Sequence, residues 1–483
     1  MQREKVCAVI GLARAGVPAA RFLAERGARV LGYDSRPLEE LSDEARALVE
    51  LGVELHTGDH KFARIKQGNM IVLSPGLKIH HPPLQSIVRD AETRGVEVIG
   101  ELELAARHCP APMIAVTGTK GKSTTVKLIA DMLQACGINA IRAGNTGVPL
   151  IAELPRLSPD AWAVVEVSSF QLERAPTFKP HIAVLLNLLA DHLDYHPSLE
   201  QYWGTKLKLF ARQNKNDIAI LNIDNDPVRE LWEGRGTFPR WHRQLKSQDY
   251  ITTAQATPPT AQWCVVCRRG DQLGFQGLPF FMPIIDVADI PLRGEHNWSN
   301  VAAAMAAAQL AADEAKIDDK TSKQAIAETI RNFESLPHRL EVIGQIGEIT
   351  WVNDSQATIP DAAVRALGAF APPVTLIAGG RAKLQDAAAF DELGQAIARQ
   401  AHLLITIGEA SKIIADAAVR AGFDAGRIID AKTLDQAVLE AARQTPAGGT
   451  VVLSPACASF DQFASFEARG AAFRAAVEAL QNK

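Results

Sequence analysis

A glycine-rich turn carries the residues of clearest chemical meaning in this sequence. The run Thr117-Gly-Thr-Lys-Gly-Lys-Ser-Thr124 follows an apolar strand pattern at residues 113–116 and leads into a helical pattern. Glycines let backbone N–H groups approach phosphate oxygens, and the first turn of a helix adds a favourable dipole. In such a loop Lys122 reaches the β- and γ-phosphates, and the hydroxyl of Ser123 can ligate Mg²⁺. The turn therefore predicts a site for a nucleoside triphosphate.

This turn is shorter than the strict phosphate-loop motif, because Val116 stands where that motif has its first glycine. An ordinary glycine turn before a helix is the alternative interpretation. The strand pattern before the turn and the Gly-Lys-Ser-Thr after it favour the phosphate site.

Acidic and imidazole side chains stand where two further strand patterns end. One pattern closes at Glu166, and Asp191, His192 and Asp194 follow the next one. The carboxyl ends of parallel strands meet at one edge of a sheet, where such sheets bind their ligands. Carboxylate and imidazole groups beside a triphosphate suit a divalent cation. Taken singly, each of these residues could equally be a solvated loop residue.

A second glycine turn lies near the N-terminus. Gly11, Arg14 and Gly16 follow a strand pattern at residues 6–10, and Asp34 ends the next strand pattern. Ala13 occupies the place of the second glycine in a dinucleotide fingerprint, so the usual close approach of a pyrophosphate is not expected. The turn still predicts a nucleotide site. A turn that begins at Ser74 and includes Gly76 faces the same edge.

Three blocks of alternating strand and helix patterns must position these residues. Short β-branched runs separated by amphipathic helices favour an α/β fold with open, mostly parallel sheets. We expect three domains, at residues 1–109, 110–333 and 334–483, with a Pro-rich break at residues 109–112 between the first two. Residues 230–290 are irregular and rich in Pro, Gln and Thr, and apart from a β-hairpin expected around residues 263–268 no pattern accounts for them.

Composition excludes several classes of function. The 483 residues carry a net charge of −4, which argues against nucleic acid or anionic lipid as a partner. The 6 cysteines form no disulfide pattern and predict a reduced, cytoplasmic setting. No apolar run is long enough to span a membrane, and the basic N-terminus is typical of a first strand, not of a signal peptide.

With these motifs the sequence resembles a known family, the Mur ligases, which are ATP-dependent amide-forming enzymes of peptidoglycan precursor synthesis. The resemblance covers nearly the whole chain and is weakest over about residues 230–290. Its motifs are the phosphate turn, Glu166-Val-Ser-Ser-Phe-Gln-Leu-Glu173, Gly294-Glu-His-Asn297, Leu336-Pro-His-Arg339, Asn353-Asp-Ser355, Ser454-Pro-Ala-Cys-Ala-Ser459 and Phe466-Glu-Ala-Arg-Gly470.

The resemblance implies a fold, a reaction and roles for residues. A Rossmann-like first domain, a P-loop-type middle domain and a Rossmann-like third domain would act on UDP-N-acetylmuramoyl-L-alanine, ATP and glutamate with Mg²⁺. The motif at residues 454–470 implies D-glutamate as the added amino acid, and the family's reaction implies an acyl-phosphate intermediate. The implied UDP-sugar contacts are Gly11, Arg14, Gly16, Asp34, Ser35, Arg36, Ser74, Gly76 and Asn145. The implied ATP contacts are Gly118, Thr119, Lys120, Gly121, Lys122, Ser123, Thr124, Asn297, Asn300, Arg339 and Asp354.

The remaining implied roles concern the metal and the amino acid. Ser123, Glu166 and His192 would bind Mg²⁺. Lys206 matches the lysine that is carbamylated in this family, and it would join them as a carboxylate. The implied catalytic residues are Lys122, Glu166, His192 and Lys206, and the implied glutamate contacts are Thr358, Lys383, Ser459 and Phe466. We expect a monomer.

Two departures from the family pattern bear on the substrate. Lys120 stands where asparagine is usual, which adds a positive charge beside the phosphates. Gln356 stands where lysine is usual, which leaves room for L-glutamate as the added amino acid.

Three alternative functions are a ligase similar to folylpolyglutamate synthase, an NAD-dependent oxidoreductase and a non-catalytic nucleotide switch. The Ser-Pro-Ala-Cys motif argues against the first of them, and the oxidoreductase leaves Gly-Lys-Ser unexplained. A switch would keep its nucleotide turnover in a Lys206→Ala variant.

Overall fold

The protein is described here by a computed structural model of residues 6–58, 69–193, 195–234, 248–253, 264–276, 280–292, 294–334, 336–382 and 387–481. The chain divides into two compact units. The first unit comprises residues 1–291 and 295–333, and the second comprises residues 292–294 and 334–483. Across the described residues, none of the helices combines the length and the apolar character needed to cross a bilayer.

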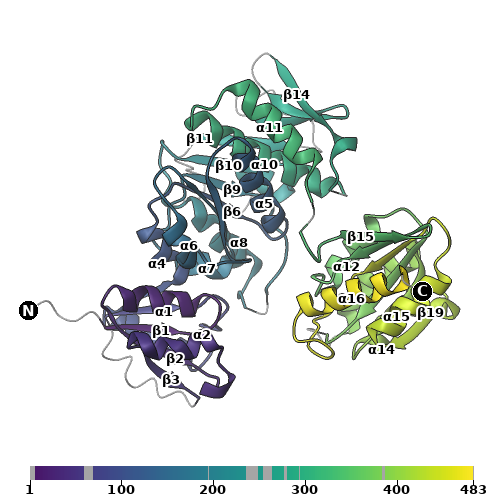
Figure 1. The fold of residues 1–483 in the computed structure, drawn as a ribbon, viewed down its shortest axis with the longest axis horizontal. Coiled ribbons are helices and arrows are strands. Elements are labelled where there is room, and N and C mark those ends of the chain that lie inside the picture. The colour runs from purple at the N-terminus through teal and green to yellow at the C-terminus, as the bar shows by residue number, and fades with distance from the viewer. Residues whose placement is uncertain are drawn as a thin grey trace, which may run out of the picture. The chain divides into compact units, whose positions relative to one another are not determined.

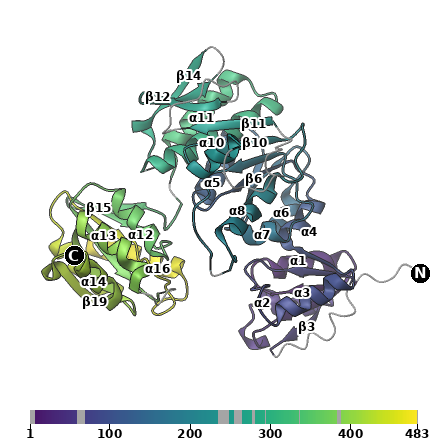
Figure 2. The same ribbon diagram turned by 180° about the vertical axis from the view of Figure 1, so that it is seen from behind.

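The first sheet of the first unit is a five-stranded parallel sheet in the order β3-β2-β1-β4-β5. Its strands are β1 Val6–Ile10, β2 Arg29–Asp34, β3 Glu54–Thr57, β4 Met70–Leu73 and β5 Glu97–Gly100, and its helices are α1 Gly16–Glu25, α2 Asp43–Arg46, α3 Leu84–Thr93 and α4 Glu101–His108. Alternate strand residues pack against α1 on one face and α3 on the other. Figure 2 shows α3 on the face seen from behind. Both faces are therefore covered, as parallel sheets require.

The second sheet of the first unit carries the phosphate turn. Its nine strands run in the order β14-β13-β12-β11-β10-β9-β6-β8-β7. The strands are β6 Met113–Thr117, β7 Ala140–Gly144, β8 Trp162–Glu166, β9 Ile182–Leu185, β10 Ile218–Asn222, β11 Gln248–Thr253, β12 Cys264–Arg269, β13 Gln272–Gln276 and β14 Phe281–Asp286. The order places β6 between β8 and β9, so the turn after β6 lies between the ends of two neighbouring parallel strands.

Seven helices accompany the second sheet among the described residues. They are α5 Lys122–Ala135, α6 Leu150–Glu153, α7 Ser169–Glu173, α8 Leu199–Leu207, α9 Asp226–Trp232, α10 Glu295–Glu314 and α11 Asp319–Arg331. The helix α10 is rich in alanine, and its small side chains let it pack closely on α5, with α11 beside both. Figure 1 shows α5, α10 and α11 grouped together beside strands of this sheet.

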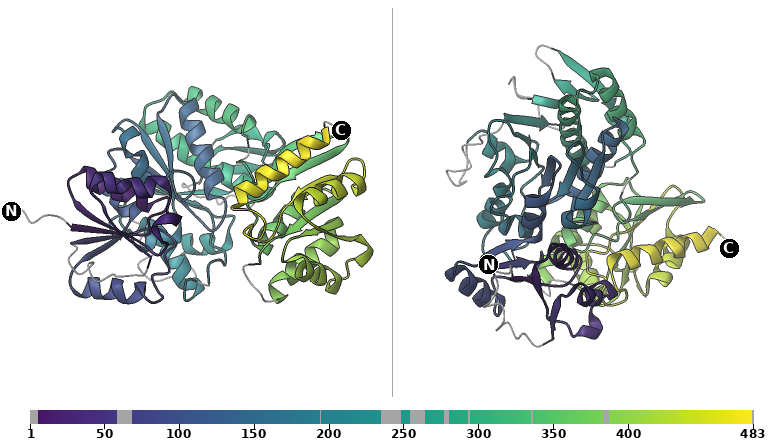
Figure 3. Two further views of the ribbon diagram at one scale, coloured as in Figure 1. Left: turned by 60° about the horizontal axis from the view of Figure 1, so that its bottom comes forward. Right: turned by 60° about the vertical axis from the view of Figure 1, so that its left-hand side comes forward.

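The second unit is a six-stranded sheet in the order β15-β16-β20-β17-β18-β19, parallel except for β15. The strands are β15 Glu341–Ile346, β16 Ile349–Asn353, β17 Val374–Gly379, β18 Ala401–Ile407, β19 Ile428–Lys432 and β20 Thr450–Leu453. The helices α12 Pro360–Gly368, α13 Asp391–Gln400 and α14 Ser411–Arg420 cover one face. The helices α15 Leu434–Gln444 and α16 Phe466–Gln481 cover the other, and Figure 3 shows α16 in yellow along this sheet.

The predicted α/β fold with open, mostly parallel sheets is confirmed. Residues 230–290, which the sequence left largely unexplained, contribute four strands to one end of the second sheet, in the described part of that segment. Three of these strands, β12, β13 and β14, join by antiparallel pairing. This segment therefore extends the second sheet at the end opposite to β7.

Candidate functional site

The phosphate turn connects β6 to α5 over four residues. Gly118 and Gly121 have φ values of +154° and +86°, which side-chain-bearing residues rarely adopt. A Cβ atom on Gly121 would lie 2.4 Å from Oδ1 of Asn300, a residue of α10. Glycine is therefore required at this position, because a side chain would strain the backbone and would collide with Asn300. The same contact places Asn300, an expected ATP contact, against the turn, where it also binds Asn297 at 3.0 Å.

Two lysines from distant parts of the chain converge on the carbonyl of Gly118. Nζ of Lys122 donates to the carbonyls of Gly118 and Thr119, both at 3.0 Å. Nζ of Lys206 donates to the same Gly118 carbonyl at 2.9 Å from α8. The side chain of Lys206 is buried. Burial, reinforced by the nearby charge of Lys122, holds the pKa of Lys206 well below its usual value.

Glu166 lies at the carboxyl end of β8 and accepts three side-chain hydrogen bonds. Its Oε2 accepts from the hydroxyl of Ser123 at 2.5 Å. Its Oε1 accepts from Nδ2 of Asn145 at 3.0 Å and from the hydroxyl of Thr146 at 2.9 Å. Hydroxyl and carboxylate oxygens so placed are the ligand type that Mg²⁺ prefers. The residues present therefore fit a magnesium ion beside the phosphate turn, as the sequence predicts for Ser123 and Glu166.

Asp191 connects the phosphate turn to His192. Its Oδ2 lies 3.1 Å from Nζ of Lys120, and its Oδ1 accepts from the backbone N–H of His192 at 2.9 Å. Burial raises the pKa of Asp191, but the charges of Lys120 and His192 outweigh that effect and lower it. The ammonium of Lys120 is therefore held on a carboxylate at the edge of the turn.

His192 itself has a φ of +54°, an uncommon backbone state for a residue with a side chain. Among the described residues, no group of three or more His, Cys, Asp and Glu side chains is close enough to hold a metal ion alone. Asp194, which the sequence placed in the same cluster, lies outside the described residues.

Asn187 and Thr146 are two polar residues of this site whose contacts the sequence did not indicate. Oδ1 of Asn187 accepts from the backbone N–H groups of Thr119 and Lys120, at 3.0 and 2.9 Å. Its Nδ2 donates to the carbonyl of Lys120 at 3.1 Å. One amide thus fixes the middle of the phosphate turn. The position of Asn187, two residues after β9, could have indicated its role, because the carboxyl ends of parallel strands meet at one edge of the sheet.

The first glycine turn is organised around Asp34. Its Oδ2 accepts from the backbone N–H of Leu12 at 2.8 Å, and its carboxylate forms a two-point ion pair with Arg36 at 2.9 Å. Burial raises the pKa of Asp34, but these bonds outweigh burial and keep it below its usual value. Arg14, on the same turn, donates to the carbonyl of Asn145 and so links the first sheet to the second.

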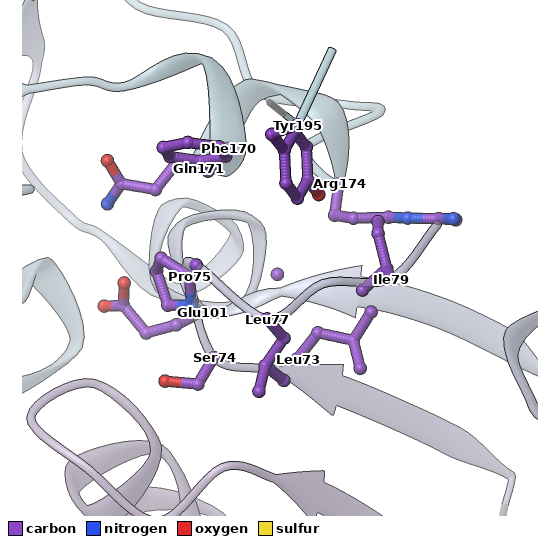
Figure 4. A pocket seen from close by; sticks show the side chains of 12 residues that line it. Leu73, Ser74, Pro75, Leu77, Ile79, Glu101, Phe170, Gln171, Arg174 and Tyr195 are labelled. Atoms are coloured by element: carbon purple, nitrogen blue, oxygen red, sulfur yellow. The ribbon is translucent and has the colours of Figure 1, made fainter. Parts of the chain in front are cut away.

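A small cavity lies where the first sheet meets α7, and Figure 4 shows its walls. Ser74, Pro75 and Leu77 form one side, and Phe170, Gln171 and Tyr195 face them from the other. Its volume of about 10 Å³ holds roughly one water molecule. The expected UDP-sugar contacts Ser74 and Gly76 therefore border the segment that carries α7.

The second unit brings several expected contacts together around Asp354. The hydroxyl of Ser454 donates to its Oδ2 at 2.8 Å, and the backbone N–H of Leu340 donates to its Oδ1 at 3.1 Å. Nε of Arg339 donates to Oε1 of Gln356. Burial raises the pKa of Asp354 to about 7, despite the opposing bond from Ser454. Gln356, which the sequence marked as a departure, thus holds the guanidinium of Arg339.

Of the expected glutamate contacts that the structure describes, Thr358 lies between β16 and α12, Ser459 follows β20, and Phe466 begins α16. The backbone N–H of Thr358 donates to the carbonyl of Gln356 at 2.9 Å. Ser459 is buried, and the carbonyl of Phe466 accepts from the hydroxyl of Ser355 at 2.8 Å. Lys383, the fourth expected contact, lies outside the described residues.

Asp354 yields a prediction about stability and pH. A carboxyl whose pKa is higher in the folded state adds stability that is present below the unfolded pKa of 3.8 and lost as the pH rises through about 7. In Asp354→Asn the amide oxygen still accepts from Leu340, and the amide nitrogen donates to Ser454. We therefore expect the free energy of unfolding of the wild type to fall relative to that of this variant between pH 4 and 8, by on the order of 3 kcal/mol.

Calorimetric unfolding of the full chain at pH 5 and pH 8 measures this effect. The exposed Asp361→Asn variant is the matched control and should keep a constant difference from the wild type at both values. A difference for Asp354→Asn that is the same at pH 5 and pH 8 contradicts the prediction.

Three domain families match this chain in order. Residues 5–100 match the Mur ligase MurD-like N-terminal domain, residues 116–308 the Mur ligase middle domain, and residues 338–457 the Mur ligase glutamate ligase domain. The chain is 37% identical over 482 residues to the UDP-N-acetylmuramoylalanine–D-glutamate ligase of Pelotomaculum thermopropionicum, covering 99% of this chain and 98% of that one. It is 35% identical over 478 residues to the enzyme of the same name from Koribacter versatilis, with 99% and 98% covered.

A solved structure shows the same fold at lower similarity. The UDP-N-acetylmuramate–alanine ligase MurC of Thermotoga maritima superposes with a TM-score of 0.57 at 16% identity, and the match covers 99% of each chain.

Proposed function

This chain belongs to the Mur ligase family, and from that premise we propose that it joins D-glutamate to UDP-N-acetylmuramoyl-L-alanine while ATP becomes ADP and phosphate. The observation that carries the amino-acid assignment is the likeness, over 99% of the chain, to relatives named for D-glutamate ligation. The relatives give no support to L-glutamate or to a folylpolyglutamate-synthase-like substrate. We also infer that it works as a monomer in the cytoplasm.

The reaction requires activation of a carboxylate, which is a poor electrophile at neutral pH. Transfer of the γ-phosphoryl group makes an acyl phosphate, the amine of glutamate then attacks its carbonyl carbon, and phosphate leaves as the amide forms. Catalysis of phosphoryl transfer is largely positioning and charge stabilisation. We assign the positive charge to Lys122, because its ammonium already lies beside the carbonyls of the phosphate turn.

Mg²⁺ would neutralise charge on the phosphates and on the developing acyl phosphate when it is bound. Ser123 and Glu166 would hold it, since their oxygens already meet at 2.5 Å. We assign His192 and a carbamylated Lys206 as further ligands. Thr146 and Asn145 orient the Glu166 carboxylate through their hydrogen bonds to its other oxygen.

The substrate-binding assignments follow the same three segments, 1–109 for the UDP-sugar, 110–333 for ATP and 334–483 for glutamate. In the first segment, Asp34 and Arg36 brace the turn that Gly11 and Gly16 delimit, and we assign Ser35, Ser74 and Gly76 to the same ligand, together with Asn145 of the second segment. In the second, Gly118, Thr119, Lys120, Gly121 and Thr124 would bind phosphates, with Asn297 and Asn300 beside them. We also assign Arg339 and Asp354 of the third segment to ATP, and Thr358, Lys383, Ser459 and Phe466 to glutamate.

Phosphate release from ATP tests the proposed reaction. We expect release to require UDP-N-acetylmuramoyl-L-alanine and D-glutamate together, and to fall to background when either is left out. A site built around the groups of one enantiomer leaves buried polar groups unpaired with the other, so L-glutamate should react at least about 100-fold more slowly. Equal rates with L-glutamate or with a diamino acid would overturn the assignment of D-glutamate, and Gln356 would then be the first residue to exchange.

A further inference from the structure

The loop after β4 reaches from the expected UDP-sugar contacts to helix α7. This loop starts at Ser74 and includes His80. The ring Nε2–H of His80 donates to Oε1 of Glu173, the last residue of α7, at 2.6 Å. The hydroxyl of Tyr195 donates to the other oxygen, Oε2, at 2.9 Å. One carboxylate therefore holds a loop of the first sheet and the segment that follows β9.

Tyr195 is joined to His192 by its backbone and by a chain of aromatic rings. Its N–H donates to the carbonyl of His192 at 3.1 Å. Its ring lies 4.6 Å from that of Phe170 at 88°, and Phe170 lies 5.0 Å from His192 at 65°. Edge-to-face pairs at these distances are favourable and directional. The orientation of His192 thus depends on where Tyr195 and Phe170 are held.

The φ of +54° at His192 makes this support necessary. A residue with a side chain in this region of backbone space is held there by its surroundings. The bonds from Tyr195 and Glu173 are part of those surroundings.

Helix α7 is held to the first sheet by other contacts as well. The N–H of Gly100 donates to the carbonyl of Arg174 at 2.7 Å, and the guanidinium of Arg174 lies 2.6 Å from Glu92. The N–H of Thr177 donates to Glu103 at 3.0 Å. Loss of the His80 imidazole should therefore leave α7 in place and release only the loop.

We propose that Glu173, His80 and Tyr195 form a clasp that couples occupancy of the UDP-sugar site to the placement of His192. The proposal rests on the proposed function, because it takes Ser74 and Gly76 as UDP-sugar contacts and His192 as a ligand of the metal–nucleotide complex. His80 is a positioning residue in this arrangement and touches neither ligand. A sugar nucleotide that orders the loop fixes His80 on Glu173, and Glu173 in turn fixes Tyr195.

Coupling of this kind is reciprocal between the two ligands. Calorimetric titration can therefore measure it without turnover, as the affinity for Mn²⁺ with a non-hydrolysable ATP analogue, with and without saturating UDP-N-acetylmuramoyl-L-alanine. We expect the sugar nucleotide to tighten binding by about fivefold in the wild type. In His80→Ala the gain should fall below about twofold, because the linking hydrogen bond is lost, while the affinity without the sugar nucleotide stays the same.

His80→Gln retains a side-chain N–H donor and should recover part of the coupling, which a merely structural role for the imidazole would not predict. Exposed His81 lies on the same loop, so His81→Ala is the matched control and should keep the wild-type value. Tyr195→Phe removes the second bond to Glu173 and should lower the coupling as His80→Ala does.

Equal coupling in the wild type and in His80→Ala, or an equal loss in His81→Ala, would overturn the clasp and leave the proposed function standing. Failure of the wild type to bind the sugar nucleotide at all would overturn the proposed function together with the clasp. A melting temperature of His80→Ala within about 2 °C of the wild type is expected, because a partly exposed side-chain contact adds little stability.

Discussion

Replacing Lys122 with methionine should lower the rate of D-glutamate ligation by about 1,000-fold while the chain stays folded. Removing one fixed donor from a site that stabilises developing charge costs about 2.7–4 kcal/mol of transition-state stabilisation. Lys122 begins α5, and its ammonium lies within hydrogen-bonding distance of the carbonyls of Gly118 and Thr119.

Separate measurement of kcat and KM for ATP shows where the loss falls. An ammonium that pairs mainly with phosphoryl charge in the transition state affects kcat more than KM. The control is Lys127→Met on the same helix, which removes an ion pair with Asp131 away from the turn and should change either constant less than twofold, as expected for a pair worth about 0.3–0.5 kcal/mol. Wild-type ligation by Lys122→Met would contradict the phosphate assignment itself.

The sequence predicted β1, β6 and β17 in the middle of their sheets, and it also predicted β5 and β15, which lie at sheet edges. Residues of β1, β6 and β17 are almost wholly buried, so their sequences are continuous apolar runs. The strands β3, β7 and β19 were not predicted, and each lies at the edge of its sheet. The edge strand β3 is half-buried and tolerates polar residues, since no side chain of Glu54–Thr57 is fully buried. Its local sequence therefore resembles a loop.

In the candidate site, the sequence indicated residues at strand ends but not Lys206, which lies on helix α8. Glu166 and Asp191 could be found because they follow buried strands whose carboxyl ends meet. Lys206 could not, because its local sequence is that of an ordinary helix and only the packing of α8 against the phosphate turn buries it. The resemblance to a family was the one signal that marked it.

The sequence also did not indicate which residues Lys120 and Gln356, the two departures from the family pattern, contact. Lys120 could be interpreted only as an added charge beside phosphate, whereas in the structure its ammonium is paired with Asp191. Gln356 could be interpreted only as a missing cation, whereas its amide oxygen accepts from Arg339. Both contacts join residues that are 17 or more positions apart in the chain, and spacing alone does not identify such pairs.

Lys206→Ala should lower the rate of ligation at least about 1,000-fold, and Lys206→Glu should restore part of the activity. Carbamylation requires a neutral amine, since only the free electron pair attacks CO₂. Burial keeps the pKa of this lysine well below its usual value, so a larger share of its amine is neutral at a given pH than in an exposed lysine. The carbamate that forms is an anion, and the ammonium groups of Lys120 and Lys122 would stabilise it. A glutamate at this position supplies a permanent carboxylate on a shorter side chain, and so recovers only part of the roughly 2.7 kcal/mol or more that such a group contributes to charge stabilisation.

Carbon-13 NMR of protein equilibrated with labelled bicarbonate tests the chemical state directly. We expect one carbamate resonance in the wild type and none in Lys206→Ala. Lys208, two residues further on, is also a lysine whose pKa is lowered by burial, so Lys208→Ala is the matched control and should keep the resonance. Persistence of the resonance in Lys206→Ala would place the modification elsewhere, and wild-type ligation by that variant would remove Lys206 from the mechanism. Because a carbamate converts a buried cation into an anion beside Glu166 and Ser123, its loss should also weaken the binding of Mn²⁺ measured in the presence of the ATP analogue, even where no turnover occurs.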